Sequence, residues 1–333
     1  MIDREKIIKG RFFTKTQLWL KPQVEQFIRE SNCTIAYDPF AGYGDLLSCH
    51  SSYGIKETTG LDIDETMGWQ FNDSLLHIPH IERAIIITNP PYLSNYSASR
   101  KKVMSDVALY FKNSEHDNLY LIALDRMLEA QTYVVALVPE TFLNALYPQK
   151  NKLHSLTVLE ENPFEDTDSP VCVVCFDGIP KSPKTIKVYK NEDYIMSLEE
   201  LESMRPKAKH TVAAKFNAPD GWLGLRAVDT TDPNNTIKFD LKENFDYDWE
   251  KGIKISSRLL STISIEVSPK DRPMFIKRCN DLLSEMRKKT NDLILSPFKG
   301  NMKNGVRRRR LDYYTARAIM EKAYEELFGT SNI

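Results

Sequence analysis

Short apolar, β-branched runs alternate with amphipathic segments over the first 180 residues of the chain. The runs predict strands at residues 34–38, 57–61, 84–88, 132–139, 156–159 and 171–176. Helical spacing of apolar residues predicts helices that begin near residue 16 and that cover residues 119–128 and 140–146. This alternation predicts an α/β domain with a doubly wound sheet, whose last two strands form an antiparallel pair at its edge.

The chain changes character after two prolines, Pro180 and Pro183, which predict a domain junction. Beyond them, short alternating runs precede two helical patterns. The runs lie at residues 185–189, 221–228, 236–239 and 253–256, and the helical patterns lie near residues 272–289 and 315–328. We therefore expect two domains, at residues 1–180 and 185–333, the second of the α+β type.

The composition is that of an ordinary soluble protein, with 41% hydrophobic and 27% charged residues among 333. A net charge of −1 excludes a basic coat over the whole chain, so any nucleic-acid surface has to be local. One segment departs from this balance: residues 268–310 hold 13 Lys and Arg against 4 Asp and Glu, a local charge of +9. Its end, residues 298–310, is rich in Asn and Gly and predicts a basic loop.

Basic residues in two segments are candidates for contact with nucleic acid. In the loop at residues 298–310, Lys and Arg would contact phosphates while Asn and Arg reach base edges; the alternative is a solvated surface or localisation-like run. For the earlier segment, phosphate contact and an ordinary solvated loop are both open. The candidates are Arg100, Lys101, Lys102, Lys299, Lys303, Arg307, Arg308, Arg309 and Arg310.

The five cysteines predict no metal or redox site. Cys172 and Cys175 have the spacing of a metal-binding pair, but they lie in an apolar run that predicts a strand. Strand alternation directs their sulfur atoms to opposite faces of the sheet. The sequence also shows no signal peptide and no apolar run of 18 residues, so we expect a cytoplasmic protein without membrane contact.

Two consecutive prolines end the strand predicted at residues 84–88 and stiffen the loop Asn89-Pro90-Pro91-Tyr92. An amino group conjugated with a base or a carbonyl is a poor nucleophile, because its lone pair is delocalised. The Asn89 side-chain oxygen and the Pro90 carbonyl would accept its two N–H groups and free that lone pair. The Tyr92 ring would stack on a base, worth about 1–3 kcal/mol. The alternative is a strand-ending turn in which Asn89 has a structural role only.

Three acids lie close to predicted strands of the first domain: Asp38 ends the first strand, Asp62 follows the second, and Asp73 precedes the strand at residues 84–88. Asp38 precedes a turn with Gly42 and Gly44, which lacks the third glycine of a dinucleotide fingerprint and the lysine of a phosphate loop. An acid before such a turn suits a cationic or amino-bearing ligand. Asp62, roughly 20 residues further on, would hold ribose hydroxyls. Asp73 either accepts from the amino group of an adenine-like ring or is a solvated turn residue.

Three other positions have a structural interpretation beside the functional one. Asp64 is expected to be a helix N-cap, and Thr14 or Thr16 would cap the first helix. Phe164, in a loop between two predicted strands, either anchors that loop in the core or forms a second stacking wall.

Taken in order, these motifs resemble the S-adenosylmethionine-dependent amino methyltransferases of DNA, in the motif order often called the gamma group. The resemblance covers roughly residues 10–178 and implies a Rossmann-like catalytic domain followed by a target-recognition domain. It assigns cofactor binding to Thr14, Asp38, Phe40, Gly42, Gly44, Asp62, Ile63 and Asp73. It assigns catalysis to Asn89, Pro90, Pro91 and Tyr92, and base stacking to Tyr92 and Phe164.

The resemblance further implies direct transfer of a methyl group to a base flipped out of double-stranded DNA. Asparagine, rather than serine, as the first residue of the catalytic motif favours adenine N6 over cytosine N4 as the methylated atom. A cognate restriction endonuclease is an expected partner. Three alternatives stay open. The first is a protein-glutamine methylase, since the lone pair of a side-chain amide nitrogen is delocalised in the same way. The others are an RNA-base methylase and a non-catalytic DNA-binding module. The target sequence and the oligomeric state are not determined by the sequence.

Overall fold

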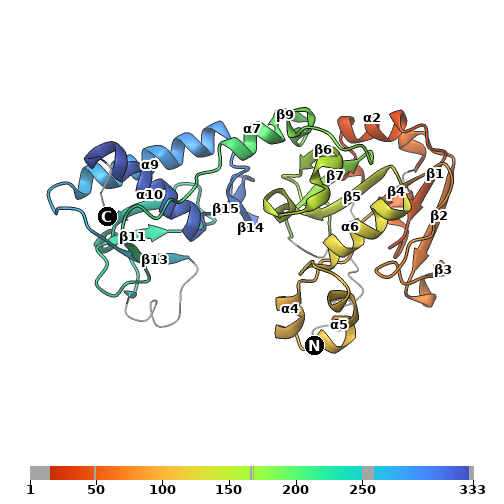
Figure 1. Cartoon of the computed structure of the whole chain (residues 1–333), viewed down its shortest axis with the longest axis horizontal. Coiled ribbons are helices and arrows are strands. Elements are labelled where there is room, and N and C mark those ends of the chain that lie inside the picture. The colour runs from red at the N-terminus through yellow and green to blue at the C-terminus, as the bar shows by residue number, and fades with distance from the viewer. Residues whose placement is uncertain (1–15, 49, 166, 168, 250–258, 330–333) are drawn as a thin grey trace. The chain divides into compact units, whose positions relative to one another are not determined.

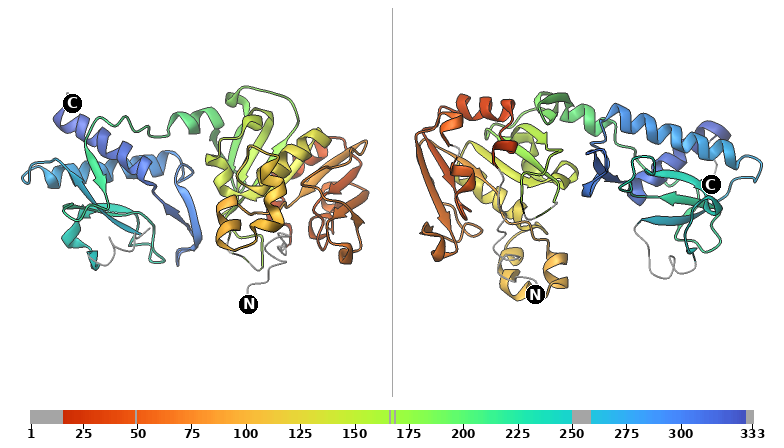
Figure 2. Two further views of the ribbon diagram at one scale, coloured as in Figure 1. Left: turned by 60° about the horizontal axis from the view of Figure 1, so that its bottom comes forward. Right: turned by 180° about the vertical axis from the view of Figure 1, so that it is seen from behind.

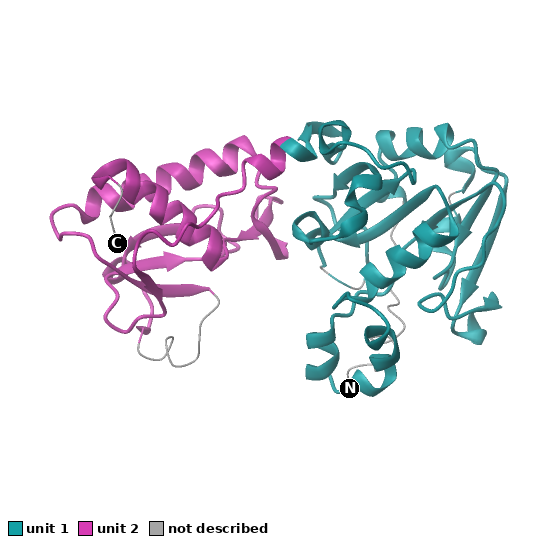
Figure 3. Ribbon diagram, viewed as in Figure 1, with its two compact units in different colours: residues 1–199 teal, residues 200–333 magenta. Residues whose placement is uncertain are grey.

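The computed structural model describes residues 16–48, 50–165, 167, 169–249 and 259–329. The chain divides into two compact units, at residues 1–199 and 200–333 (Figure 3). Within the described residues the strands form three sheets, of nine, four and two strands. Thr14 lies outside these residues, as does the run at residues 253–256.

The sheet of unit 1 has the strand order β3-β2-β1-β4-β5-β7-β6-β8-β9 (Figure 1). Its strands are β1 Ile35–Asp38, β2 Glu57–Asp62, β3 Gln70–Phe71, β4 Ala84–Thr88, β5 Val134–Pro139, β6 Leu153–Val158, β7 Val171–Phe176, β8 Lys187–Lys190 and β9 Asp193–Ser197. The first five strands in this order are parallel, and β7 is antiparallel to both of its neighbours. Because successive strands leave β1 in opposite directions, the sheet has a switch point between β1 and β4. The predicted doubly wound α/β class is confirmed.

The edge of this sheet differs from the prediction. β6 and β7 form the expected antiparallel pair, but β8 pairs with β6, and β9 pairs with β8. The run at residues 185–189 therefore belongs to the first unit. The division follows Glu199 rather than residues 180–185, because β8 and β9, which come after the two prolines, are hydrogen-bonded into the sheet of unit 1.

Helices cover both faces of the sheet. Up to residue 185, the helical segments are η1 Thr16–Trp19, α2 Pro22–Glu30, α3 Asp45–Ser48, η2 His50–Tyr53, η3 Glu65–Met67, α4 Asn95–Arg100, α5 Met104–Lys112, α6 Leu119–Ala130, η4 Glu140–Asn144, η5 Pro148–Lys152 and η6 Pro183–Thr185. Val24, Phe27 and Ile28 of α2 join the buried cluster on one face, together with residues of α3 and η2. The α6 helix packs on the opposite face, and α4 and α5 project from the sheet as a small pair (Figures 1 and 2).

Unit 2 contains an antiparallel sheet of order β10-β13-β11-β12 and two long helices. Its elements are α7 Leu198–Ser203, which begins in unit 1, β10 Ala214–Phe216, β11 Leu223–Arg226, β12 Lys238–Leu241, η7 Lys242–Asn244, β13 Leu260–Ile265, α9 Arg272–Lys289 and α10 Tyr313–Phe328. The helices predicted near residues 272–289 and 315–328 are confirmed. Asp312 begins α10 as its N-cap, accepting from the Thr315 amide at 2.8 Å.

The predicted basic loop at residues 298–310 is wrong. Here the chain forms an antiparallel hairpin of β14 Ser296–Asn301 and β15 Arg307–Arg310. The four consecutive arginines hide the alternation that marks a strand, since every position is basic. In β15 they nevertheless alternate in burial, with Arg307 and Arg309 buried.

Candidate functional site

The Asn-Pro-Pro-Tyr loop begins at the carboxyl end of β4, beside the switch point of the sheet. Thr88, the last residue of β4, is fully buried, and the two prolines of the loop, Pro90 and Pro91, are buried as well. Asn89, which lies between Thr88 and Pro90 in the sequence, is half-buried. Ligands of open α/β sheets bind at this end of the strands and at the switch point, so the loop stands where a site is expected.

Asp38 ends the neighbouring strand β1 and is joined to β4 through Thr88. Its Oδ1 accepts hydrogen bonds from Thr88 Oγ1 at 2.5 Å and from the Phe40 amide at 2.9 Å. The side chain is 2% exposed, and burial raises the pKa of this carboxyl to about 7, although both hydrogen bonds act in the opposite direction. Asp38 is thus a buried acid poised near neutrality, one strand from Asn89.

Asp62 fastens the glycine turn that follows β1. Its two carboxylate oxygens accept from the backbone amides of Gly42 and Asp64, each at 2.8 Å. Gly42 and Gly44 have φ of +49° and +78°, conformations that a residue with a side chain rarely adopts. Asp64 caps η3 by accepting from the Thr66 amide, as predicted.

Trp69 is a residue of this region that the sequence analysis missed. Its Nε1 donates to the Gly42 carbonyl at 2.8 Å. Its ring fills the space beside two glycines: a Cβ added at Gly44 would lie 3.0 Å from the ring, and one at Gly60 would lie 2.7 Å from it. Both glycines are therefore needed for the indole to pack against the turn. A lone tryptophan gives no sequence signal for such a contact.

Asp73 lies after β3, the strand next to β2, and its carboxylate is held on both sides. Oδ1 accepts from the Leu75 amide at 3.2 Å, and Oδ2 accepts from the hydroxyl of Tyr110 in α5 at 2.9 Å. Burial, followed by this bond to Asp73, raises the pKa of Tyr110 above its ordinary value. Tyr110 was not among the predicted site residues.

Tyr92 is folded back onto its own loop. Its hydroxyl lies within hydrogen-bonding distance of Asn89 Oδ1 and, at 2.9 Å, of the Leu137 carbonyl of β5. Burial raises the pKa of this phenol well above its ordinary value. Phe164 meets the Tyr92 ring edge to face, with 6.4 Å between ring centroids, and is only 3% exposed. In this structure Phe164 therefore belongs to the core, and Tyr92 to a hydrogen-bonded loop.

The structure brings most of the predicted acids to one edge of the sheet. Asp62 and Asp38 end the adjacent strands β2 and β1, Asn89 directly follows β4, and Asp73 lies two residues after β3. Near the same turns, Ile63 is 42% exposed and Phe40 is half-buried. In the part of the chain that the structure describes, no three His, Cys, Asp or Glu side chains are grouped so as to hold a metal ion.

The predicted DNA contacts fall into three groups. Arg100, Lys101 and Lys102 are exposed at the end of α4, in unit 1. Lys299 and Lys303 are exposed on the hairpin of unit 2, where Arg308 and Arg310 are half-buried. Arg307 and Arg309 are 3% and 1% exposed. Side chains this deeply buried support the hairpin and do not reach a phosphate at its surface. The prediction that Arg307 and Arg309 contact DNA is therefore corrected.

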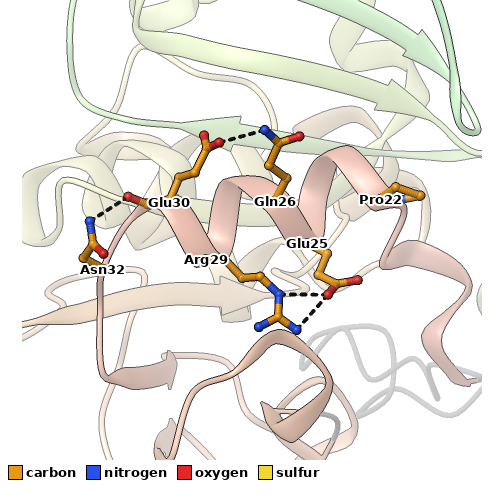
Figure 4. A pocket seen from close by; sticks show the side chains of 6 residues that line it. All are labelled: Pro22, Glu25, Gln26, Arg29, Glu30 and Asn32. Atoms are coloured by element: carbon orange, nitrogen blue, oxygen red, sulfur yellow. Dashed lines mark hydrogen bonds and ion pairs between the residues drawn. The ribbon is translucent and has the colours of Figure 1, made fainter.

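A surface pocket along α2 brings none of the predicted residues together (Figure 4). It is lined by Pro22, Glu25, Gln26, Arg29, Glu30 and Asn32. Its polar side chains are already bonded to one another along the helix, Gln26 to Glu30 and Arg29 to Glu25.

No family model matches the chain, and no curated protein matches it either. Several solved structures are similar to part of the chain. One is a proposed class I S-adenosylmethionine-dependent methyltransferase from Listeria monocytogenes, at 11% identity over 56% of this chain and 67% of that one, with a TM-score of 0.39. Another is a modification subunit of a proposed type I restriction enzyme from Vibrio vulnificus, at 15% identity over 54% and 47%, with a TM-score of 0.39.

A third is the methyltransferase subunit of a type I restriction-modification system from Streptococcus thermophilus, at 17% identity over 58% of this chain and 53% of that one, with a TM-score of 0.37. The chain spans about half the length of the Vibrio and Streptococcus proteins. Among the helices in the described ranges, none has the length and apolar character needed to cross a membrane.

Proposed function

We propose that the chain is an S-adenosylmethionine-dependent methyltransferase that modifies the N6 amino group of adenine in double-stranded DNA. The observation that carries this proposal is the position of Asn89. It follows β4 directly at the switch point, one residue after Thr88, which is bonded to the buried Asp38 on the adjacent strand. An acceptor for an amino group thus lies beside an acid suited to a cationic ligand.

The residues around the glycine turn fit the cofactor. Asp38 would face its cationic amino-acid part, together with Gly42 and Gly44. A Cβ added at Gly42 meets no atom within 4 Å, so the turn is open on that side. Asp62 is fixed by two backbone amides, and its carboxylate would face the ribose hydroxyls. Asp73 would accept from the adenine amino group, with Ile63 and Phe40 against the ring. When bound, the cofactor supplies an electrophilic methyl group on a sulfonium.

Asn89 and Pro90 would prepare the acceptor nitrogen. The Asn89 side-chain oxygen and the Pro90 carbonyl each accept one N–H of the target amino group, which draws its lone pair out of conjugation. Holding the nitrogen in line with the methyl group is the main contribution of the protein, because alignment and oriented dipoles supply most of the rate enhancement in such reactions. The Tyr92 hydroxyl already donates to the Asn89 side-chain oxygen. The target amino group would either displace this donor or bind to the second lone pair of the same oxygen.

The proposed substrate is DNA, from which a base would have to leave the duplex to reach Asn89. Tyr92 contacts Asn89, and Phe164 packs against the Tyr92 ring. Opening of their edge-to-face contact would provide the stacking surface. The basic residues of unit 2 supply local positive charge in a chain that is neutral overall. A role in restriction-modification, beside an endonuclease that reads the same site, is part of this proposal.

The test is methyl transfer from labelled cofactor to three acceptors: double-stranded DNA, RNA and a glutamine-containing peptide. We expect label in DNA, at N6-methyladenine after digestion. Asn89→Ala should keep cofactor binding and lose transfer, while Asn113→Ala, at an exposed asparagine that ends α5, should leave both unchanged. Label in RNA or peptide only, or full activity in Asn89→Ala, would overturn the proposal.

A further inference from the structure

The β14–β15 hairpin of unit 2 is closed by a compact tip, in which Met302 is buried and residues 303–306 are exposed. The amide of Met302 donates to the Val306 carbonyl at 2.8 Å, and the amide of Gly305 donates to the Met302 carbonyl at 2.9 Å. Asn304 tightens the turn further, since its Oδ1 accepts from the Val306 amide. Glycines with φ of +73° and +84° at positions 300 and 305 permit these bends. The tip is therefore a defined structure with its own hydrogen bonds.

The four arginines of β15 divide between the two faces of the hairpin. Arg307 and Arg309 lie on the buried face, and Arg308 and Arg310 lie on the other face, where they are half-buried. The backbone of Arg309 is held by the fully buried Asp229, whose Oδ2 accepts from its amide at 3.0 Å. The same carboxylate binds the guanidinium of Arg287 in α9 at 3.0 Å through both oxygens. One face of the ribbon is thus anchored in unit 2.

The other face presents one positioned cation, Arg308. The Arg308 guanidinium lies over the Phe298 ring of the paired strand, 4.8 Å from its centroid. Its Nε donates to the Asp229 carbonyl at 2.8 Å. A guanidinium stacked in this way loses little further conformational freedom when it meets a ligand. Lys299, Asn301 and Lys303 are exposed elsewhere on the hairpin. Asn301 lies opposite Arg307 in the ladder, and the amide of Lys303 is held by the Thr231 carbonyl at 2.9 Å.

We infer that this hairpin is a two-stranded ribbon that enters the major groove of double-stranded DNA. Lys299 and Lys303 would contact phosphates, and Asn301 would read a base edge. The inference rests on the proposed function and specifies how its substrate is recognised. The major groove admits a two-stranded β-ribbon, and an asparagine side chain pairs with the N6 and N7 edge of adenine through two hydrogen bonds. The deep, narrow major groove of an RNA duplex excludes such a ribbon, so the shape favours DNA.

The first experiment measures binding of the full chain to a mixed-sequence DNA duplex over a range of salt concentrations. In Lys299→Gln/Lys303→Gln we expect weaker binding and a slope of log K against log salt that is smaller by roughly 1.8, because each phosphate contact contributes about 0.9. Lys270→Gln/Lys322→Gln removes the same charge from exposed positions of unit 2 and should leave the slope unchanged. Equal slopes in both double variants, or tighter binding to an RNA duplex, would overturn the inference.

The second experiment tests base reading by mapping methylated sites in a randomised plasmid library. Asn301→Ala should relax the preference at one or two positions of the recognised sequence and retain cofactor binding. An unchanged site preference would reject Asn301 as the reader. If wild-type protein methylates DNA while all hairpin variants behave as wild type, the hairpin inference fails and the proposed function stands; if wild-type protein binds the duplex without methylating it, the proposed function fails alone.

Discussion

The hydroxyl of Tyr110 donates a hydrogen bond of 2.9 Å to Oδ2 of Asp73, across 37 residues of the chain. The two residues come from different parts of unit 1. Asp73 follows β3, and Tyr110 belongs to α5, in the segment after the Asn-Pro-Pro-Tyr loop. The bond ties the residue proposed to read the cofactor's adenine to a helix that follows the proposed catalytic loop. It also leaves Asp73 with one fixed donor on each oxygen.

We expect Tyr110→Phe to weaken cofactor binding about five-fold, because the oriented Asp73 loses a hydrogen bond worth about 1 kcal/mol. Calorimetry with the cofactor and with an analogue whose adenine amino group is replaced by oxygen measures this. The affinities of the variant for the two ligands should differ less than those of the wild type, since Asp73 is the residue proposed to accept from the adenine amino group. Tyr96→Phe, at a 68% exposed tyrosine of α4, is the control. Discrimination equal to wild type in Tyr110→Phe would contradict the positioning role.

The hydroxyl and the ring of Tyr92 make separable contributions. Tyr92→Phe keeps the ring and removes the donor to Asn89 and Leu137, so methyl transfer should change by a few-fold at most. Tyr92→Ala removes the stacking surface, worth about 1–3 kcal/mol, and should slow single-turnover transfer by about ten- to a hundred-fold. Cofactor binding should persist in both variants. Equal losses in the two variants would show that the hydroxyl, and not the ring, is what matters.

Asp38 should give the protein a pH-dependent stability. Its pKa is about 7 in the folded chain and 3.8 when unperturbed, so the folded state binds the proton more tightly. The resulting stabilisation is complete below pH 3.8 and is lost as pH rises towards 7, by up to about 1.4 kcal/mol per pH unit.

The variant Asp38→Asn isolates this effect. Both hydrogen bonds to Asp38 end on Oδ1, which asparagine retains. Urea denaturation between pH 5 and pH 8 should therefore show a fall in the stability of wild type relative to the variant. A constant difference over this range would mean that Asp38 titrates normally. The variant should also bind the cofactor more weakly, because no carboxylate faces its amino group.

Asp229 should be essential to the stability of unit 2. Its carboxylate accepts from the amides of Ile237 and Arg309 and from both terminal nitrogens of Arg287. Asp229→Asn leaves Arg287 with Asp292 as its remaining carboxylate partner, so we expect a loss of about 3 kcal/mol, the lower end for a broken buried pair. Thermal denaturation measures the loss, and hydrogen exchange should localise it to α9 and the hairpin. The exposed Asp232→Asn should have no comparable effect.

The sequence by itself determined the features that depend on neighbouring residues. The prolines at 90 and 91 end β4, and Asp64 caps η3. The apolar spacing of residues 272–289 predicted the helix that the structure shows as α9. The alternation of strands and helices likewise predicted the doubly wound sheet. Each of these follows from local propensity, so a short window of sequence contains the necessary information.

The tertiary structure alone decided which distant residues meet. Thr88 bonds Asp38 across 50 residues, and Trp69 packs on glycines that precede it by up to 25 positions. Four identical side chains in β15 have opposite surroundings, because the pleat and the anchoring Asp229 bury two of them and leave two near the surface. Such contacts depend on how whole elements pack. No local pattern encodes them, and for this protein they decide which of the predicted residues can reach a ligand.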